Sequence, residues 1–335
     1  MAAMHAAMED LPRRMKASLR LMAVDMFKTR AERQYSTMDE FHKLLVPFAE
    51  LVEGGSMELL GSGGFGDVYK AQWGAETVAV KMIRGGTVGT VRNAFIQELR
   101  VMMDLKQPNL LHVIAACIEP ESLCIVTPWC ARGSLYDVAH GGAELPWATR
   151  HCLAHDVVRG MAFLHDRHRM VHRDLKSLNV LVTDRWSALV ADFGLSRTRA
   201  DSTTVTASMR REQPRPTVGT LQWMAPELMS LQGHQDYFAA DVYAFGIILW
   251  ELAAREPPYV GVDEGTIRAG VKAGERPEIP ADCPAEWTAL IKACWAQKPA
   301  DRPRFAALAG PLRALVDATP GVAQTPPPGY SERYV

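Results

Sequence analysis

The chain has 335 residues and a mass of 37.0 kDa, and its 48% hydrophobic and 22% charged residues are typical of a globular protein. The formal net charge of -1 provides no overall field to favour nucleic acid or an anionic membrane as a partner. The six cysteines contain no C-x-x-C pair, and no apolar run approaches the roughly 20 residues of a membrane helix, so we expect a cytoplasmic, or else nuclear, protein with reduced thiols.

Residues 1–50 are rich in methionine and carry apolar side chains three and four residues apart, which predicts a helical extension. The pattern consists of Leu11, Met15, Leu19, Met22 and Met26. We expect this extension to pack on the following domain or on a partner. A basic mitochondrial transit peptide is a second interpretation, which the acidic residues Glu9, Asp10, Asp25 and Glu32 weaken.

A glycine motif, Gly61-x-Gly63-x-x-Gly66, lies between two short apolar runs, and a third run follows at 77–82. The motif alone also fits a dinucleotide-binding oxidoreductase, but in that fold a helix follows the glycines. Here a strand pattern follows at 68–73. We therefore predict a β-hairpin flap over phosphates, because glycine has no Cβ to prevent close approach of the backbone.

Lys81 ends the third of these strands, and Glu98 lies in a helix predicted over 91–103. A lysine removed from water needs a counter-charge, so we predict that Lys81 pairs with Glu98 and contacts nucleotide phosphates. Considered alone, the two residues also fit a simpler interpretation, in which Lys81 is a solvent-exposed lysine and Glu98 is a solvated charge on the helix surface. The motifs that follow favour the ion pair.

Residues 125–127 form another strand pattern, which leads into the segment Pro128-Trp129-Cys130-Ala131-Arg132-Gly133. This segment predicts a connector between two lobes, whose backbone can hydrogen-bond the edge of an adenine.

Three short motifs then follow in order within 172–227. They are His172-Arg173-Asp174-Leu175 with Asn179, Asp192-Phe193-Gly194, and Ala225-Pro226-Glu227. Each occurs by chance in long chains, but together and behind the glycine flap they indicate transfer of a phosphoryl group from ATP to a protein hydroxyl. Beyond them, the nearly all-apolar stretch 241–253 predicts a buried helix, and the proline-containing last dozen residues predict a disordered tail.

With these motifs in this order, the chain resembles a eukaryotic protein kinase domain. The resemblance implies an α+β bilobal fold, with a small β-rich N-lobe and one main helix above a larger, mostly helical C-lobe. We expect a helical extension over 1–50, a kinase domain over 51–317 and a tail over 318–335. Within the domain the N-lobe would cover about 51–127, the hinge 128–133 and the C-lobe 134–317.

The resemblance also implies a role for each matching residue. Asp174 matches the base for the substrate hydroxyl, Lys176 matches a lysine that contacts the γ-phosphate, and Asn179 and Asp192 match ligands of Mg²⁺. The expected catalytic set is Asp174, Lys176, Lys81 and Glu98. The expected ATP-binding set is Gly61, Ser62, Gly63, Gly64, Phe65, Gly66, Val68, Ala79, Lys81, Thr127, Trp129, Cys130 and Leu181.

Other matches concern the support of the C-lobe and of the regulatory core. Glu227 and Arg302 resemble a buried ion pair that braces the C-lobe, and Asp241 resembles the aspartate that holds the backbone of the catalytic loop. The resemblance further implies a stacked column of four residues, namely Met102, Val113, His172 and Phe193.

Some motifs are typical of serine/threonine kinases and others of tyrosine kinases. Lys176 and Gly219-Thr220 match serine/threonine kinases, whereas Trp223-Met224 leans toward tyrosine kinases. The mixture resembles the tyrosine-kinase-like group, such as the Raf-like and mixed-lineage kinases, which implies Ser/Thr protein substrates and a role in intracellular signalling. A tyrosine or dual-specificity kinase is the nearer alternative, and a pseudokinase scaffold is disfavoured because the catalytic residues are all present.

Arg173 directly precedes Asp174, which in this family marks kinases whose activation segment is ordered by phosphate. The segment between Gly194 and Thr220 contains Ser196, Thr198, Ser202, Thr203, Thr204, Thr206, Ser208 and Thr217. Our hypothesis is that an upstream kinase phosphorylates Thr217 or a residue within 202–208, and that the phosphate docks near Arg173. A solvated Ser/Thr-rich loop is the simpler alternative.

Overall fold

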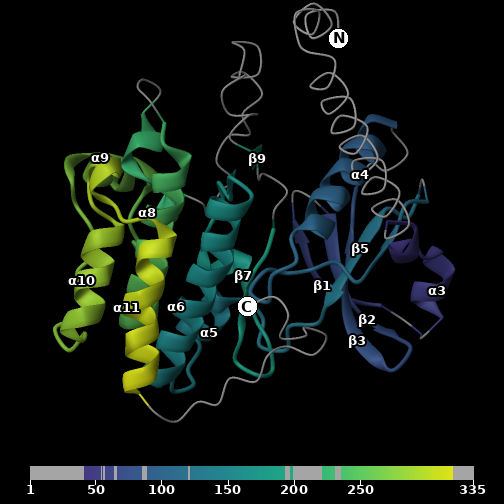
Figure 1. The fold of residues 1–335 in the computed structure, drawn as a ribbon, viewed down its shortest axis with the longest axis horizontal. Helices are drawn as coiled ribbons and strands as arrows, with labels where there is room; N and C mark the ends of the chain where they lie inside the picture. The colour runs from purple at the N-terminus through teal and green to yellow at the C-terminus, as the bar shows by residue number, and fades with distance from the viewer. Residues whose placement is uncertain are drawn as a thin grey trace, which may run out of the picture.

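The structure is a computed structural model with two lobes (Figure 1). It describes residues 41–53, 55, 57–63, 66–84, 89–119, 121–192, 197–198, 221–230 and 235–319. A β-sheet with helix α4 forms the smaller lobe, and a body of helices forms the larger one (Figure 1). The predicted α+β bilobal fold is therefore confirmed.

The N-lobe is built on a five-stranded antiparallel sheet with the strand order β1-β2-β3-β5-β4. Its strands are β1 (Glu58–Gly63), β2 (Gly66–Trp73), β3 (Glu76–Met82), β4 (Ala115–Cys117) and β5 (Cys124–Pro128). The three strands predicted around the glycine motif and the strand predicted at 125–127 are confirmed. Helix α4 (Gly89–Asp104) confirms the helix predicted over 91–103.

Gly66 begins β2 at a place where only glycine fits. Its φ is +141°, and a Cβ at this position would overlap the carbonyl oxygen of Met82 in the neighbouring strand. Any side chain here would push β2 away from β3. At Gly61, by contrast, a Cβ would meet open space, so packing within the described residues does not require a glycine there.

Residues just upstream of the expected kinase boundary at 51 pack on the N-lobe. Leu45 forms a parallel bridge with Ala116, and the backbone N–H of Val46 donates to the Ala116 carbonyl at 3.0 Å. These contacts cover the outer edge of β4. Phe41 is buried in the same core as Phe95 of α4, and the short helix α3 (Phe48–Val52) follows. The methionine-rich pattern of residues 1–40 and the tail from residue 320 lie outside the described residues.

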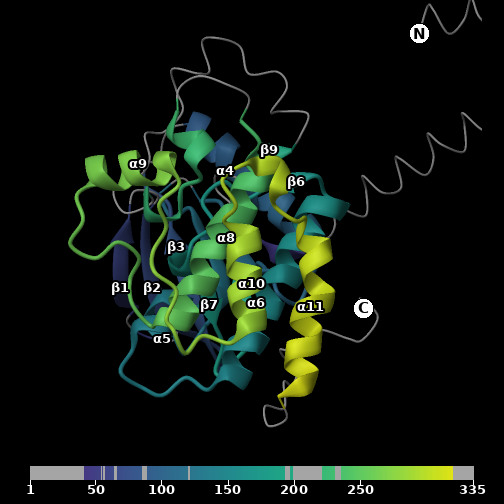
Figure 2. The same ribbon diagram turned by 90° about the vertical axis from the view of Figure 1, so that its left-hand side faces the viewer.

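The C-lobe is mostly helical, with α10 packed on α8 and α11 packed on α6 (Figures 1 and 2). Its helices are α5 (Leu135–His140), α6 (Trp147–Ala162), α8 (Tyr237–Ala254), α9 (Glu264–Ala273), α10 (Ala285–Cys294) and α11 (Phe305–Ala318). Two small sheets pair β6 (Met170–Val171) with β9 (Arg197–Thr198) and β7 (Val180–Val182) with β8 (Ala188–Val190).

Helix α8 is the buried centre of the C-lobe, as predicted for 241–253. It begins after Asp236, whose carboxylate accepts hydrogen bonds from the backbone N–H groups of Phe238 and Ala239 at 3.1 Å. The helix is long and apolar enough to suit a membrane span, with a mean hydropathy of 1.4. However, 72% of that stretch is buried inside the protein, which is the property of a core helix.

Arg255 ends α8 in the left-handed conformation, with a φ of 59°. Glycine is the usual residue at such a position because a side chain adds strain there. The Arg255 guanidinium offsets this cost by donating to carbonyl groups just beyond α5, including those of Gly141 at 2.6 Å and Ala143 at 3.0 Å. The ends of α5 and α8 are therefore fastened together.

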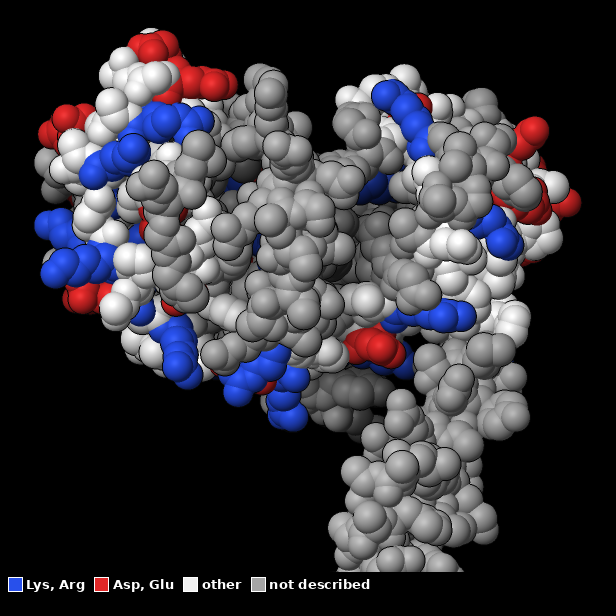
Figure 3. All heavy atoms as spheres, turned by 90° about the horizontal axis from the view of Figure 1, so that it is seen from above, with Lys and Arg blue, Asp and Glu red and all other residues white. Residues whose placement is uncertain are grey.

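Charged side chains of both signs are interspersed over the described surface in Figure 3. No large area of one sign covers the described part of that face, in keeping with the small formal net charge of -1. Long-range attraction by a single-sign field is thus not a feature of this face.

Candidate active site

Asp241 of α8 holds the first half of the loop that carries Asp174. Its buried carboxylate accepts hydrogen bonds from the backbone N–H of His172 at 2.8 Å and from that of Arg173 at 3.0 Å. Arg173 has a φ of 70°, a strained conformation for a non-glycine residue. The two hydrogen bonds stabilise that conformation, and the predicted role of Asp241 is confirmed.

His172 links the same loop to the strand that precedes Asp192. Its Nδ1 lies 3.3 Å from the backbone nitrogen of Asp174, and its Nε2 lies 2.8 Å from the carbonyl oxygen of Ala191. Because a backbone N–H donates and a carbonyl accepts, these contacts require a neutral imidazole with its proton on Nε2. The ring therefore sets the distance between the segments that carry Asp174 and Asp192.

Asp174 is oriented by two neighbours in its own loop. Lys176 Nζ lies 2.9 Å from Asp174 Oδ2, and the side-chain amide of Asn179 donates to the same oxygen at 3.0 Å. Asn179 also donates to the Asp174 carbonyl at 2.7 Å. Both of these contacts reach Oδ2 of Asp174.

Lys81 of β3 in the N-lobe contacts Asp192, which follows β8 of the C-lobe. Its Nζ lies 3.0 Å from Asp192 Oδ1, and the two side chains are 30% and 31% exposed. The contact brings together two residues that the sequence placed in one site. The side chain of Glu98 lies outside the described residues, so the Lys81–Glu98 pair remains a prediction.

Asn179 and Asp192 present oxygen donors that fit Mg²⁺. Their segments are joined by a hydrogen bond of 2.8 Å from the Ala191 N–H to the Asn179 carbonyl. The Asn179 amide nitrogen is turned toward Asp174, so its oxygen is directed away from that carboxylate. Within the described ranges no three His, Cys, Asp or Glu side chains form a metal-binding cluster. The pair therefore suits an ion that completes its shell with phosphates and water.

The residues expected around adenine come from both lobes. Val68 of β2 is paired with Lys81 of β3. Ala79 lies two residues before Lys81 in β3 and is paired with Thr127 of β5, so all three positions lie on the same sheet as the lysine. Leu181 lies in β7 of the C-lobe, opposite Leu189. The expected base-contacting residues are thus divided between the sheet of the N-lobe and β7 of the C-lobe.

The flap and the hinge supply the remaining expected contacts. Gly61 and Ser62 lie in β1, and the backbone of Gly63 ends it, whereas Gly64 and Phe65 are outside the described residues. In the hinge, the centre of the Trp129 ring lies 5.2 Å from Nζ of Lys70, a residue of β2. Burial raises the pKa of the Cys130 thiol to about 12, so this thiol stays protonated and unreactive.

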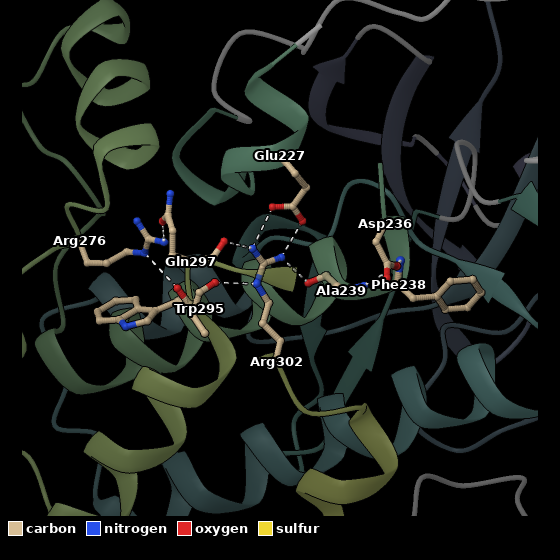
Figure 4. A network of polar contacts seen from close by, with 9 residues as sticks. Glu227, Asp236, Phe238, Ala239, Arg276, Trp295, Gln297 and Arg302 are labelled. Carbon is tan, nitrogen blue, oxygen red and sulfur yellow. Dashed lines mark hydrogen bonds and ion pairs between the residues drawn. The ribbon is translucent and has the colours of Figure 1, made fainter. Parts of the chain in front are cut away.

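The predicted brace of the C-lobe is present between Glu227 and Arg302 (Figure 4). The two guanidinium nitrogens of Arg302 donate to the two carboxylate oxygens at 2.6 and 2.8 Å. Arg302 is fully buried and also donates to the carbonyls of Ala239 at 2.9 Å and Ala296 at 2.8 Å. It therefore fixes the segment around Glu227 to the start of α8.

Three of the four residues expected in the regulatory column lie among the described residues. Met102 and His172 are buried and Val113 is half-buried, whereas Phe193 lies outside the described residues. The column as a whole stays a prediction.

Sequence reasoning missed one buried acid near the site, Glu251 of α8. Its carboxylate accepts from the Ser177 hydroxyl at 2.7 Å and from the Trp223 indole N–H at 2.8 Å. Burial raises the pKa of this carboxyl to about 8. The one available signal was an acidic residue in a stretch that is otherwise apolar nearly all round.

Comparison with known proteins agrees with this geometry. The family described as "Protein tyrosine and serine/threonine kinase" matches residues 56–312. The chain is 38% identical over 268 residues to putative serine/threonine-protein kinase/receptor R831 of Acanthamoeba polyphaga mimivirus, which covers 78% of the chain and 16% of that protein. It is 37% identical over 266 residues to probable serine/threonine-protein kinase drkD of Dictyostelium discoideum, covering 78% and 19%.

A plant relative shows the same degree of similarity. The chain is 37% identical over 281 residues to serine/threonine-protein kinase CTR1 of Arabidopsis thaliana, which covers 82% of the chain and 32% of that protein. The matched region thus spans less than a third of the length of each of these three relatives.

Proposed function

Because the chain belongs to the protein tyrosine and serine/threonine kinase family, we propose that it transfers the γ-phosphoryl group of ATP to serine and threonine hydroxyls of proteins. The observation that carries the proposal is the contact of 2.9 Å between Lys176 Nζ and Asp174 Oδ2. Lysine two residues after the catalytic aspartate is the serine/threonine pattern of the family. The names of the three relatives support the same substrate class.

The residues of the site divide the chemical work between proton transfer and charge stabilisation. Asp174 accepts the proton of the substrate hydroxyl at Oδ1 while its Oδ2 is held by Lys176 and Asn179. Lys176 and Lys81 place positive charge where phosphoryl oxygens become more negative, which lowers the barrier to transfer. Magnesium held by Asn179 and Asp192 would supply further neutralisation of the phosphates.

The test is incubation of the protein with Mg²⁺-ATP and generic protein substrates, followed by phosphoamino-acid analysis. We expect phosphoserine or phosphothreonine from the wild type, with the Asp192→Asn variant as the inactive control. Phosphotyrosine as the sole product would contradict the substrate class. Equal background signal from both proteins, after treatment with a broad-specificity activating kinase, would indicate a scaffold and contradict the enzyme.

We also propose that phosphate on the activation segment raises the activity. Arg173 supports this, because it lies beside the catalytic residue and its guanidinium is 4.5 Å from the centre of the Tyr237 ring. A phosphate adds about -1.5 to -2 charges and pairs strongly with arginine. The candidates Ser196, Ser202, Thr203, Thr204, Thr206, Ser208 and Thr217 lie outside the described residues, and Thr198 is in β9.

For this proposal we expect mass spectrometry of active protein to find phosphate within 202–217, and phosphatase treatment to lower kcat. The physical reason is that the charge orders the segment against Arg173. Fully active protein that carries no phosphate between Ser196 and Thr217 would contradict it.

A further inference from the structure

A short segment that precedes the region matched to the kinase family packs on the N-lobe. The family match begins at residue 56, whereas Phe41 is 8% exposed and belongs to the same hydrophobic core as Phe95 and Leu99 of α4. The guanidinium of Arg100, also on α4, lies 5.5 Å from the centre of the Phe41 ring. A cation at this distance over an aromatic ring is attracted to it. Phe41 is therefore part of the surface that holds α4.

The other end of this segment is fixed to the sheet. Leu45 follows Phe41 by about one helical turn and forms a parallel bridge with Ala116 of β4. The next residue, Val46, donates its backbone N–H to the Ala116 carbonyl at 3.0 Å. Residues 41–46, which we call the upstream segment, therefore connect α4 to the outer edge of the sheet.

The bridge at Leu45 lies in the same cross-strand row as Lys81. Lys81 of β3 is paired with Ile125 of β5. Ile125 is paired in turn with Ala116 of β4, which Leu45 bridges. Neighbouring strands are about 4.8 Å apart, so Leu45 is three such steps from the lysine along one row. The upstream segment therefore contacts α4 at one end, and its other end is in register with the residue that Glu98 is expected to pair with.

Two contacts between described residues hold α4 on either side of Glu98. Arg92, near the start of the helix, donates from Nε to the carbonyl of Ile118, just after β4, at 3.2 Å. Arg100 contacts Phe41 nearer the other end. The two arginines are eight residues apart, which is about 12 Å along a helix, and Glu98 lies between them. Loss of the contact with Phe41 would loosen the half of α4 that carries Glu98, while the first half stays attached.

We propose that Phe41 is a positioning residue for phosphoryl transfer, which holds α4 so that Glu98 stays within reach of Lys81. The inference rests on the proposed kinase function, because the Lys81–Glu98 pair belongs to that reaction. Phe41 acts through α4 and does not itself touch the reacting atoms. The upstream segment thus extends the functional unit beyond residues 56–312, the region that matches the family.

The first test replaces Phe41 and its partner Arg100. Phe41→Ala removes the ring, and we expect kcat to fall about 10-fold, because small displacements of catalytic groups lower the rate strongly. Phe41→Leu keeps most of the buried apolar volume and should recover part of the lost kcat. Arg100→Met keeps an apolar contact with the ring but removes the charge, and should lower kcat about 2- to 5-fold. Unchanged kcat in all three variants would overturn the inference.

A second phenylalanine provides the matched control. Phe48 lies seven residues after Phe41 and packs against a separate hydrophobic cluster that contains Val80. Phe41→Ala and Phe48→Ala should both lower the free energy of unfolding. Only Phe41→Ala should increase the hydrogen exchange of α4 relative to that of α8, and only Phe41→Ala should lower kcat about 10-fold. Equal changes in Phe48→Ala, in both exchange and kcat, would overturn the inference.

A double variant tests whether Phe41 acts through Glu98. Glu98→Gln removes the charge that is expected to pair with Lys81, and should itself lower kcat. If Phe41 positions Glu98, adding Phe41→Ala should lower kcat no further than Glu98→Gln alone. A general loss of packing would instead multiply the two losses, and that result would overturn the inference. If Phe41→Ala does not fold, Phe41→Leu gives the same comparison.

Hydrogen exchange also separates this inference from the proposed function. If the wild type transfers no phosphate after treatment with an activating kinase, the kinase proposal fails. Faster exchange of α4 in Phe41→Ala, but not in Phe48→Ala, would still show that Phe41 holds the helix. If the wild type is active and both kcat and the exchange of α4 are unchanged in Phe41→Ala, the positioning role fails alone.

Discussion

Replacing Asp192 with asparagine is expected to lower kcat by at least about 100-fold, the scale of losing one preorganised electrostatic contact to a transition state. The change removes the negative charge that contacts Lys81 at 3.0 Å and that, under the proposed function, would hold Mg²⁺. Asparagine has the same shape and tolerates the φ of 64° at this position. The fold should therefore persist while phosphoryl transfer is lost, as measured with Mg²⁺-ATP and a protein substrate.

The control for this prediction is Asp282→Asn, the same substitution at an exposed position before α10. It should leave kcat unchanged, and thermal unfolding should show both variants folded. Magnesium titration adds a second criterion, because weakened metal binding raises the concentration needed for half-maximal activity. Wild-type kcat in folded Asp192→Asn would contradict the assignment of Asp192 to the metal.

Replacing Arg302 with methionine is expected to cost about 3–5 kcal/mol of the free energy of unfolding. Glu227 would keep a partly buried charge with no partner, and the carbonyls of Ala239 and Ala296 would lose their donor. This loss is a large share of a typical total stability of about 5–15 kcal/mol. Urea unfolding measured by the fluorescence of the tryptophans would give the difference.

Two comparisons make that result specific. Adding Glu227→Met to Arg302→Met should recover part of the loss, because the unpaired charge is then removed. Arg313→Met disrupts the ion pair between Arg313 and Asp317, whose side chains are 62% and 57% exposed, and should leave the midpoint of urea unfolding nearly unchanged. Equal losses for Arg302→Met and Arg313→Met would contradict the buried brace.

Helices and strands that are marked by a pattern within their own residues could be predicted from the sequence. The strands around Gly61–Gly66 follow from short apolar runs separated by glycines, and α8 follows from its apolar composition. Asp174, Asn179 and Asp192 were placed in one site because their motifs occur in a fixed order. The contacts from Asp241 and between Glu227 and Arg302 came from the resemblance to kinases and are confirmed by their hydrogen bonds.

Contacts between residues far apart in the sequence are not marked by any pattern within one segment. Glu251 meets Ser177 across 74 positions of the chain, and hydrophobic periodicity says nothing about which buried acid finds which partner. The same holds for Leu45, whose pairing with Ala116 depends on an open edge of β4 that only the assembled sheet creates. Helical periodicity in residues 1–50 gave no indication of it.

Hydrogen bonds hold both ends of α5, next to the segment that connects the two lobes. Arg255 secures the end of this helix, and a reciprocal pair of hydrogen bonds between Ser134 and Asp137 secures its start. Directly before it, the Arg132 N–H donates to the Val182 carbonyl at 3.1 Å, and the Val182 N–H donates to the Gly133 carbonyl at 2.9 Å. At the C-lobe end of the connector, Arg132 and Gly133 are therefore held to β7. Trp129 and Cys130 precede these contacts, in the part of the backbone expected to bind adenine, so we expect a change in the angle between the lobes to bend the same backbone that binds the nucleotide.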